Sequence, residues 1–81
     1  MRITIRLFAI LRERCGINEL ALDLPQGSTV AAARDEFQRR FPQSSDIMAR
    51  AAYAVNRSYA PVTTDLQEGD EVAVIPPVSG G

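Results

Sequence analysis

The sequence predicts an α+β domain in which one main helix covers one face of a mixed β-sheet. Three observations support this prediction. Apolar residues alternate near both ends of the chain, in residues 2–8 and again around Val72 and Val74. A single long segment, residues 26–42, has the spacing of an amphipathic helix. The other predicted strands are short and lie on either side of this helix, an order typical of α+β domains.

The opening segment "RITIRLF", residues 2–8, predicts the first strand. Every second side chain is apolar and points to one face, while Phe8 lies on the opposite face with the polar residues. The face that we expect toward the helix carries Ile3, Ile5 and Leu7. The next segment, "AILRERCG", predicts one or two helical turns that end at Gly16, a residue suited to a helix C-terminus.

Leucines alternate again in "NELALDLP", and Pro25 ends this second predicted strand. Because the connection to the first strand is short, the two strands are expected to form an antiparallel pair.

The main helix is predicted within "QGSTVAAARDEFQRRFP", with Ser28 or Thr29 as the N-cap and Pro42 as the stop signal. The apolar stripe expected to face the sheet consists of Val30, Ala33, Phe37 and Phe41. On the solvent side, the i,i+4 spacing predicts two ion pairs, Asp35 with Arg39 and Glu36 with Arg40.

After the main helix, "SSDIMARA" predicts a short helical turn capped by Ser45 or Asp46. The segments "AYAVN" and "YAPV" predict short strands that flank a turn at Asn56–Arg57.

The last strand follows a turn at Glu68–Gly69–Asp70. It places Val72 and Val74 on the face toward the helix and the intervening Ala73 and Ile75 on the other face. With the first and last strands side by side in the centre of the sheet, the arrangement fits a β-grasp fold. We therefore predict a domain over residues 1–75, followed by an extended tail over residues 76–81.

The composition argues against several classes of function. The formal net charge is −1, so neither nucleic acid nor a membrane surface is an expected partner. Histidine is absent, all nine basic residues are arginine, and no Cys and carboxylate cluster has the spacing of a metal site. A single cysteine and the lack of a convincing signal peptide or membrane span predict a cytoplasmic protein.

Cys15 is the one candidate side-chain nucleophile. Arg12 and Arg14 are close enough in sequence to lower the pKa of its thiol. No histidine is present as a partner base, and free cysteines are commonly buried as small apolar residues. We therefore favour a packing role for Cys15.

The composition of the tail, "PPVSGG", is typical of an extended segment that places the C-terminal carboxylate in the active site of a partner. Pro76 and Pro77 fix φ and remove amide donors, which directs the chain outward in an extended form. Val78 and Ser79 carry the last side chains that a partner can grip. Gly80 and Gly81 lack a Cβ and are able to thread a narrow channel. Residues 77–81, fully extended, span about 15 Å.

The α-carboxylate of Gly81 is then the candidate reactive group. Adenylation would convert it into an acyl-AMP, and a sulfur donor would displace the AMP. The product, a C-terminal thiocarboxylate, is ionised at neutral pH and is a soft nucleophile. The carbonyl of a terminal glycine is unhindered on both faces, which suits this chemistry.

The ending "GDEVAVIPPVSGG", the opening "ITIRLFAILRERCG" and the helix after "LPQGSTV" together resemble the MoaD family, the ubiquitin-like sulfur-carrying small subunits of molybdopterin synthase. The resemblance extends over the whole chain. It implies a β-grasp fold and a Gly81 that cycles between carboxylate, acyl-adenylate and thiocarboxylate. It implies no catalysis by this chain alone and no cofactor bound by it.

The same resemblance implies three partners. An E1-like adenylyltransferase would activate the tail with ATP and magnesium, and a sulfur donor protein would supply the sulfur. The large synthase subunit would then accept the tail in a heterotetramer of two small and two large subunits. There the thiocarboxylate would give sulfur to cyclic pyranopterin monophosphate, and two transfers would build the dithiolene of molybdopterin.

The strand faces also predict a docking surface. Phe8 and Ile75 are expected to point away from the helix on adjacent strands, and Tyr59 to join them from a neighbouring strand. An exposed apolar patch of this kind often marks a partner site. Scattered apolar residues that merely close the ends of the sheet are the alternative.

Three other functions remain open from sequence. The chain has the shape of the sulfur carrier of thiazole synthesis for thiamine, although that family shares mainly the two terminal glycines. It also fits a ubiquitin-like modifier, which could cap another protein but, lacking lysine, could not form chains through its own side chains. A β-grasp interaction module with an idle tail is the third alternative.

Overall fold

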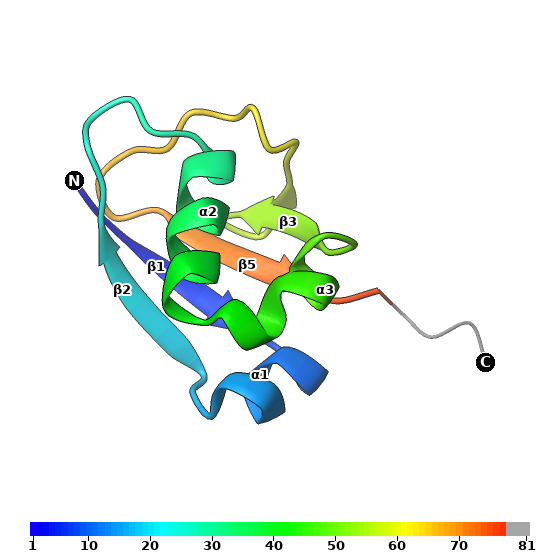
Figure 1. Ribbon diagram of the computed structural model, residues 1–81. Helices are drawn as coiled ribbons and strands as arrows, with labels where there is room; N and C mark the ends of the chain where they lie inside the picture. Colours follow the sequence, from blue (N-terminus) through cyan, green and yellow to red (C-terminus); the bar gives the residue numbers. More distant parts are fainter. Residues whose placement is uncertain (78–81) are drawn as a thin grey trace.

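A computed structural model describes residues 1–77 of the chain. The elements follow in the order β1 (Arg2–Leu7), α1 (Ala9–Cys15), β2 (Glu19–Asp23), α2 (Val30–Arg40), the 3₁₀ helix η1 (Pro42–Ser44), α3 (Ser45–Met48), β3 (Ala52–Val55), β4 (Ser58–Tyr59) and β5 (Glu71–Ile75). Figure 1 shows α2 lying across one face of the sheet, with α1 and α3 at the end of the sheet toward which β1 and β5 run.

The five strands form one sheet in the order β2-β1-β5-β3-β4. β1 and β5 are parallel, and the other neighbouring pairs are antiparallel. The predicted central position of the first and last strands and the antiparallel pairing of the first two are thus confirmed. The first strand is one residue shorter than predicted, because Phe8 serves as the N-cap residue of α1 with an extended backbone.

The core lies between the sheet and α2. The predicted inward residues of β1 and β5 are all at most 2% exposed: Ile3, Ile5, Leu7, Val72 and Val74. From the helix, Val30, Ala33 and Phe37 are fully buried against them. Phe41 follows α2 as its C-cap residue, half-buried, with its ring 4.9 Å from that of Phe37. The predicted apolar stripe therefore forms the centre of the domain.

The end of α1 shows why Gly16 is needed there. Gly16 has φ of 75°, in the left-handed region that glycine enters without a steric penalty, and its amide donates to the carbonyl of Arg12 at 2.9 Å. The predicted C-terminus of this helix is confirmed.

Thr29, one of the two predicted caps, is the N-cap of α2, since its hydroxyl accepts a hydrogen bond from the amide of Ala32 at 3.3 Å. Ser28 instead donates its hydroxyl to the carbonyl of Pro25 at 2.8 Å. We expect Thr29→Ala to lower the free energy of unfolding by about 1 kcal/mol, because one amide at the helix start loses its partner. Ser28→Ala is the matched control, and urea denaturation of the two variants should show a clearly smaller loss for it.

One of the two predicted ion pairs on α2 is wrong. Glu36 pairs with Arg40 at 2.9 Å as predicted, but it also binds Arg39, which was expected to pair with Asp35. Asp35 instead binds Arg34 at 3.1 Å. Arg39 lies three residues from Glu36, a spacing that also brings side chains together on a helix.

Glu36 provides a pH-dependent contribution to stability. Hydrogen bonds from Arg39 and then Arg40 lower the pKa of its carboxyl group from 4.5 to about 2. Because the pKa is lowered on folding, the stabilisation is present above pH 4.5 and is lost as the pH falls toward 2. Carboxyl titration by NMR should show this low pKa in the unchanged protein. In Arg39→Gln/Arg40→Gln, the pKa should rise toward 4.5; an unchanged low value would contradict the assignment.

The predicted caps of α3 are wrong. The hydroxyls of Ser44 and Ser45 donate to the carbonyls three residues earlier, at 2.7 and 2.9 Å, and Ser44 as the N-cap residue makes no side-chain cap. The carboxylate of Asp46 binds Arg14 at 3.0 Å. The sequence pattern did not reveal the 3₁₀ helix η1, which continues directly into α3 and replaces a separate helix start.

The predicted turn at Asn56–Arg57 is confirmed, with both residues at positive φ. The strand predicted as "YAPV" is wrong in extent, because β4 contains only Ser58 and Tyr59. Pro61 has no amide hydrogen to extend the pairing.

Candidate functional site

The described part of the tail is its root. Ile75 ends β5, where it pairs with Ala52 of β3, and Pro76 and Pro77 follow. The predicted site residues Val78, Ser79, Gly80 and Gly81 lie outside the described residues. Since β5 is hydrogen-bonded to β1 on one side and β3 on the other, the root starts from the centre of the sheet.

The three predicted docking residues line one hollow on the face of the sheet opposite α2. Phe8 is 41% and Tyr59 77% exposed, and Ile75 is half-buried between them. The floor of this hollow of about 420 Å³ includes Ala73 and Ala54, which are paired across β5 and β3. Because these two side chains are small, the larger rings stand around a depression.

A second hollow, of about 920 Å³, lies at the tail root between α1 and α3. It shares Phe8 and Ile75 with the first hollow and adds Ile10, Ile47 and Pro76. Sequence reasoning missed Ile10, which is 43% exposed. The exposure of Ile10 could have been predicted, because a short helix that buries Leu11 points the side chain of the preceding residue away from the core.

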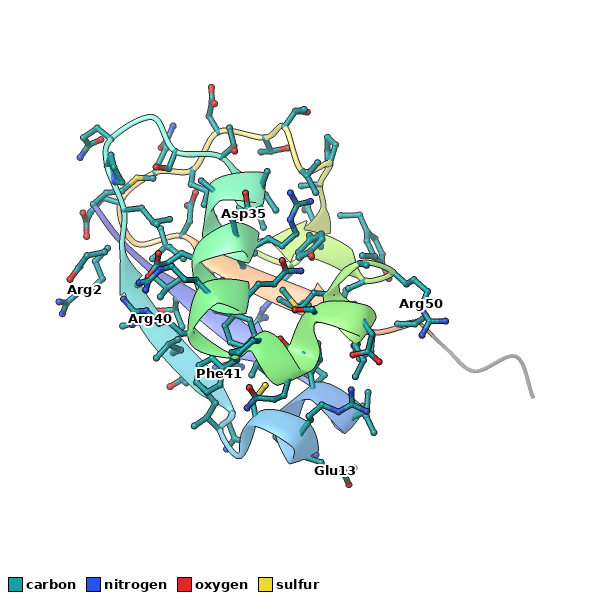
Figure 2. The ribbon with its side chains drawn as sticks, viewed as in Figure 1. Arg2, Glu13, Asp35, Arg40, Phe41 and Arg50 are labelled. Carbon is teal, nitrogen blue, oxygen red and sulfur yellow. The ribbon has the colours of Figure 1, made fainter. Side chains whose placement is uncertain are left out.

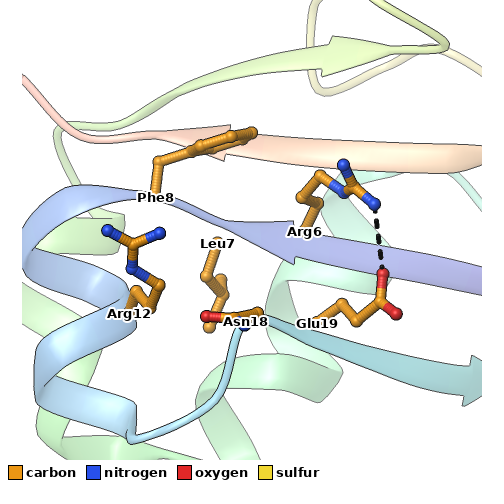
Figure 3. Close-up of a pocket in the computed structure, with 6 residues that line it drawn as sticks. All are labelled: Arg6, Leu7, Phe8, Arg12, Asn18 and Glu19. Atoms are coloured by element: carbon orange, nitrogen blue, oxygen red, sulfur yellow. Dashed lines mark hydrogen bonds and ion pairs between the residues drawn. The ribbon is translucent and has the colours of Figure 1, made fainter.

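A third hollow, of about 310 Å³, lies on the other side of Phe8 (Figure 3). Arg12 of α1 and Asn18 line it, together with the ion pair that Arg6 and Glu19 form at 3.3 Å across β1 and β2. We call the surface formed by these three hollows, which all include Phe8, the Phe8 face.

Cys15 lies away from the Phe8 face and packs against the hydrophobic core. Partial burial raises the pKa of its thiol above the usual value, and the opposing effect of Arg14 is smaller. The raised pKa does not favour a nucleophile, and the contact of Cys15 with the core agrees with the predicted packing role.

Side-chain chemistry is scarce in residues 1–77. No group of three or more His, Cys, Asp or Glu side chains in this range could hold a metal ion. Among the described helices, none has the length and apolar character needed to cross a membrane. What the described residues do provide is an apolar surface around the start of the tail.

These features define a ubiquitin-like β-grasp domain whose C-terminal segment starts at the centre of the sheet. Comparison with known proteins goes one step further. The chain belongs to the ThiS family, whose model matches residues 5–81. The predicted fold is confirmed, and relatives described as sulfur carrier subunits confirm the predicted relationship to sulfur carriers.

Individual relatives add detail. The chain is 37% identical over 81 residues to the molybdopterin synthase sulfur carrier subunit of Arabidopsis thaliana, covering 100% of this chain and 84% of that protein. SAMP1 of Haloferax volcanii, small archaeal modifier protein 1, is 28% identical with a TM-score of 0.90 and full coverage of both chains. The complex of subunits 1 and 2 of the Helicobacter pylori molybdopterin-converting factor contains the same fold, with a TM-score of 0.73, 21% identity and full coverage of both chains.

Proposed function

We propose that this protein is the sulfur carrier subunit of a molybdopterin synthase. The full-length similarity to a sulfur carrier subunit of that enzyme carries the proposal. The same similarity favours molybdopterin over the thiazole of thiamine as the destination of the sulfur. In this function residues 1–75 are the body that partners recognise, and residues 76–81 are the tail that enters their active sites.

The chemistry takes place on the carboxylate of Gly81. In the active site of an E1-like adenylyltransferase, a carboxylate oxygen attacks the α-phosphorus of ATP, and diphosphate leaves with magnesium. Sulfur supplied by a donor protein at the oxidation level of sulfide then attacks the acyl carbon and displaces AMP, so that a C–S bond replaces the C–O bond to the phosphate. In the large synthase subunit the thiocarboxylate sulfur then bonds to a carbon of cyclic pyranopterin monophosphate, and water hydrolyses the resulting thioester, which leaves the sulfur on the substrate and returns the Gly81 carboxylate. ATP and magnesium belong to the activating partner, and the chain binds no cofactor of its own.

The described residues support the part that this chain plays. The tail starts from a strand held on both sides, and Pro76 and Pro77 prevent the strand from continuing. Phe8, Ile75 and Tyr59 offer an apolar surface at that point, of the kind that protein partners cover. Val78 and Ser79 would contact the partner's channel, and Gly80 would allow close approach of its backbone. We place the complex, two small and two large subunits, in the cytoplasm.

Intact mass spectrometry tests the proposal. The purified protein is incubated with the adenylyltransferase, ATP, magnesium and a sulfur donor, and its mass is measured before and after. Replacement of one oxygen by sulfur is expected, located at the C-terminus by fragmentation. A mass that stays unchanged with a fully active adenylyltransferase would refute the carrier function.

Cys15→Ala is expected to accept sulfur to the same extent, because the thiol packs against the core and does not take part in the reaction. The same mass measurement checks this. If the variant remained folded but did not accept sulfur, the reactive group would be the Cys15 thiol and not the C-terminal carboxylate.

A second candidate function is that of a protein modifier, favoured by the similarity to small archaeal modifier protein 1. Both functions use an activated terminal glycine. They differ in product, because a modifier forms an amide with a lysine of another protein while a carrier ends as a thiocarboxylate. Covalent adducts of higher mass in the reaction above would favour the modifier.

A further inference from the structure

The charges around the Phe8 face differ from those of the rest of the molecule. Six of the nine arginines form ion pairs with carboxylates in the described residues. The other three form none within residues 1–77: Arg12, Arg50 and Arg57. All three are exposed.

These three arginines have one further property in common. Each lines a different one of the three hollows that include Phe8: Arg12 the hollow beside Asn18, Arg50 the hollow at the tail root, and Arg57 the hollow beside Tyr59. Figure 2 shows Arg50 near the point where the tail leaves the body. Each hollow of the Phe8 face therefore has, beside its apolar residues, one arginine that forms no ion pair within residues 1–77.

The formal charge follows the same pattern. The three hollows contain five arginines and three carboxylates, a net charge of +2, in a chain whose total is −1. All three carboxylates are already paired with arginine, Glu19 and Glu71 with Arg6 and Asp46 with Arg14. The remainder of the chain is accordingly acidic. We call Arg12, Arg50 and Arg57, which have no carboxylate partner in the described part of the chain, the rim of the Phe8 face. An apolar centre with guanidinium groups at such a rim complements carboxylates arranged around an apolar side chain.

We propose that the large synthase subunit covers the Phe8 face with such a surface, and that its carboxylates pair with Arg12, Arg50 and Arg57. This inference rests on the proposed function and adds the chemistry of the contact to it. Planar guanidinium groups bind carboxylates through two parallel hydrogen bonds. The rim arginines therefore fix the orientation of the domain on the large subunit and also contribute to the affinity of binding. Correct orientation aims the tail root at the partner's active site.

The experiment measures binding of the purified large subunit from the same organism by isothermal titration calorimetry. The carrier is used with its unmodified carboxylate, so that binding is separated from sulfur transfer. Arg12→Gln/Arg50→Gln/Arg57→Gln removes the rim, and Arg2→Gln/Arg39→Gln/Arg40→Gln is the matched control. Both variants lose three positive charges, but the control arginines line none of the three hollows.

The rim variant should bind roughly 10-fold or more weakly at low ionic strength, while the control changes Kd by less than about 2-fold. The affinity of the unchanged protein should fall as NaCl is raised, and that of the rim variant should fall less. Equal affinities of the two triple variants would overturn the proposal. The proposal would also be overturned if the rim variant bound the adenylyltransferase more weakly but bound the large subunit with unchanged affinity.

An error in the inference about the rim arginines can be distinguished from an error in the proposed function. If the unchanged protein binds the large subunit and accepts sulfur but the rim variant binds equally well, only the inference about the rim is wrong. If the unchanged protein neither binds the large subunit nor accepts sulfur, the proposed function is wrong and the rim proposal with it.

Discussion

Deletion of Gly81 is expected to abolish sulfur transfer while leaving the domain folded. The proposed reaction takes place on the carboxylate of that residue, and the shortened tail would place the carboxylate of Gly80 one residue, about 3.5 Å, short of the reacting position. A displacement of even about 1 Å can cost 100-fold in rate. Intact mass spectrometry after incubation with adenylyltransferase, ATP and sulfur donor should show no thiocarboxylate, and reconstituted synthase should form no molybdopterin.

Two further variants serve as controls for the deletion of Gly81. A version with one extra residue after Gly81 has a longer tail but also lacks the reactive carboxylate at the required position, and it should be equally inactive. Arg39→Gln retains the complete tail, lies outside the three hollows of the Phe8 face and should accept sulfur normally from the donor. A Gly81-deleted protein that still forms molybdopterin would show that the body, acting as an interaction module, performs the function and that the tail is idle.

Phe37→Ala is expected to have the largest effect on stability. The Phe37 side chain is fully buried at the centre of α2, and its ring stacks against that of Phe41. Replacement by alanine removes most of the ring's contacts and leaves a cavity, which typically costs about 3–5 kcal/mol. The total stability of small domains is about 5–15 kcal/mol, so a substantial fraction of the variant could be unfolded at physiological temperature. Urea denaturation followed by circular dichroism measures the loss.

Phe41→Ala is the matched control, since it removes the same group from a half-buried site at the end of the helix. Its loss of stability should be clearly smaller. Comparable losses in the two variants would indicate that the stacked pair acts as one unit, in disagreement with the placement of the core centre at Phe37.

The sequence was most informative where burial repeats with a regular period. The alternation of Ile3, Ile5 and Leu7 predicted the inward face of β1, and the spacing of Val30, Ala33 and Phe37 predicted that of α2. These patterns succeed because a strand and a helix each repeat their orientation, so a buried face leaves a signature in the chain. Phe8, Tyr59 and Ile75 were also placed together by the same reasoning.

Local polar contacts were predicted less well, for a physical reason. Asp35, Glu36, Arg39 and Arg40 allow several pairings of similar energy, and spacing alone does not choose between i,i+3 and i,i+4. Ser45 and Asp46 were assigned as caps although a 3₁₀ turn precedes them directly. The hollow at the tail root was missed because α1, α3 and the end of β5 come together there only after the chain has folded.

The position of β5 has a mechanical consequence. A carrier must be withdrawn from its partner after each transfer, and any pull on the tail is applied along this strand. Since β5 is hydrogen-bonded to β1 and β3 along its length, such a load acts on both ladders in shear, and many bonds have to break together before the strand slips. The domain should consequently resist a pulling force on the tail that would separate an edge strand from a sheet.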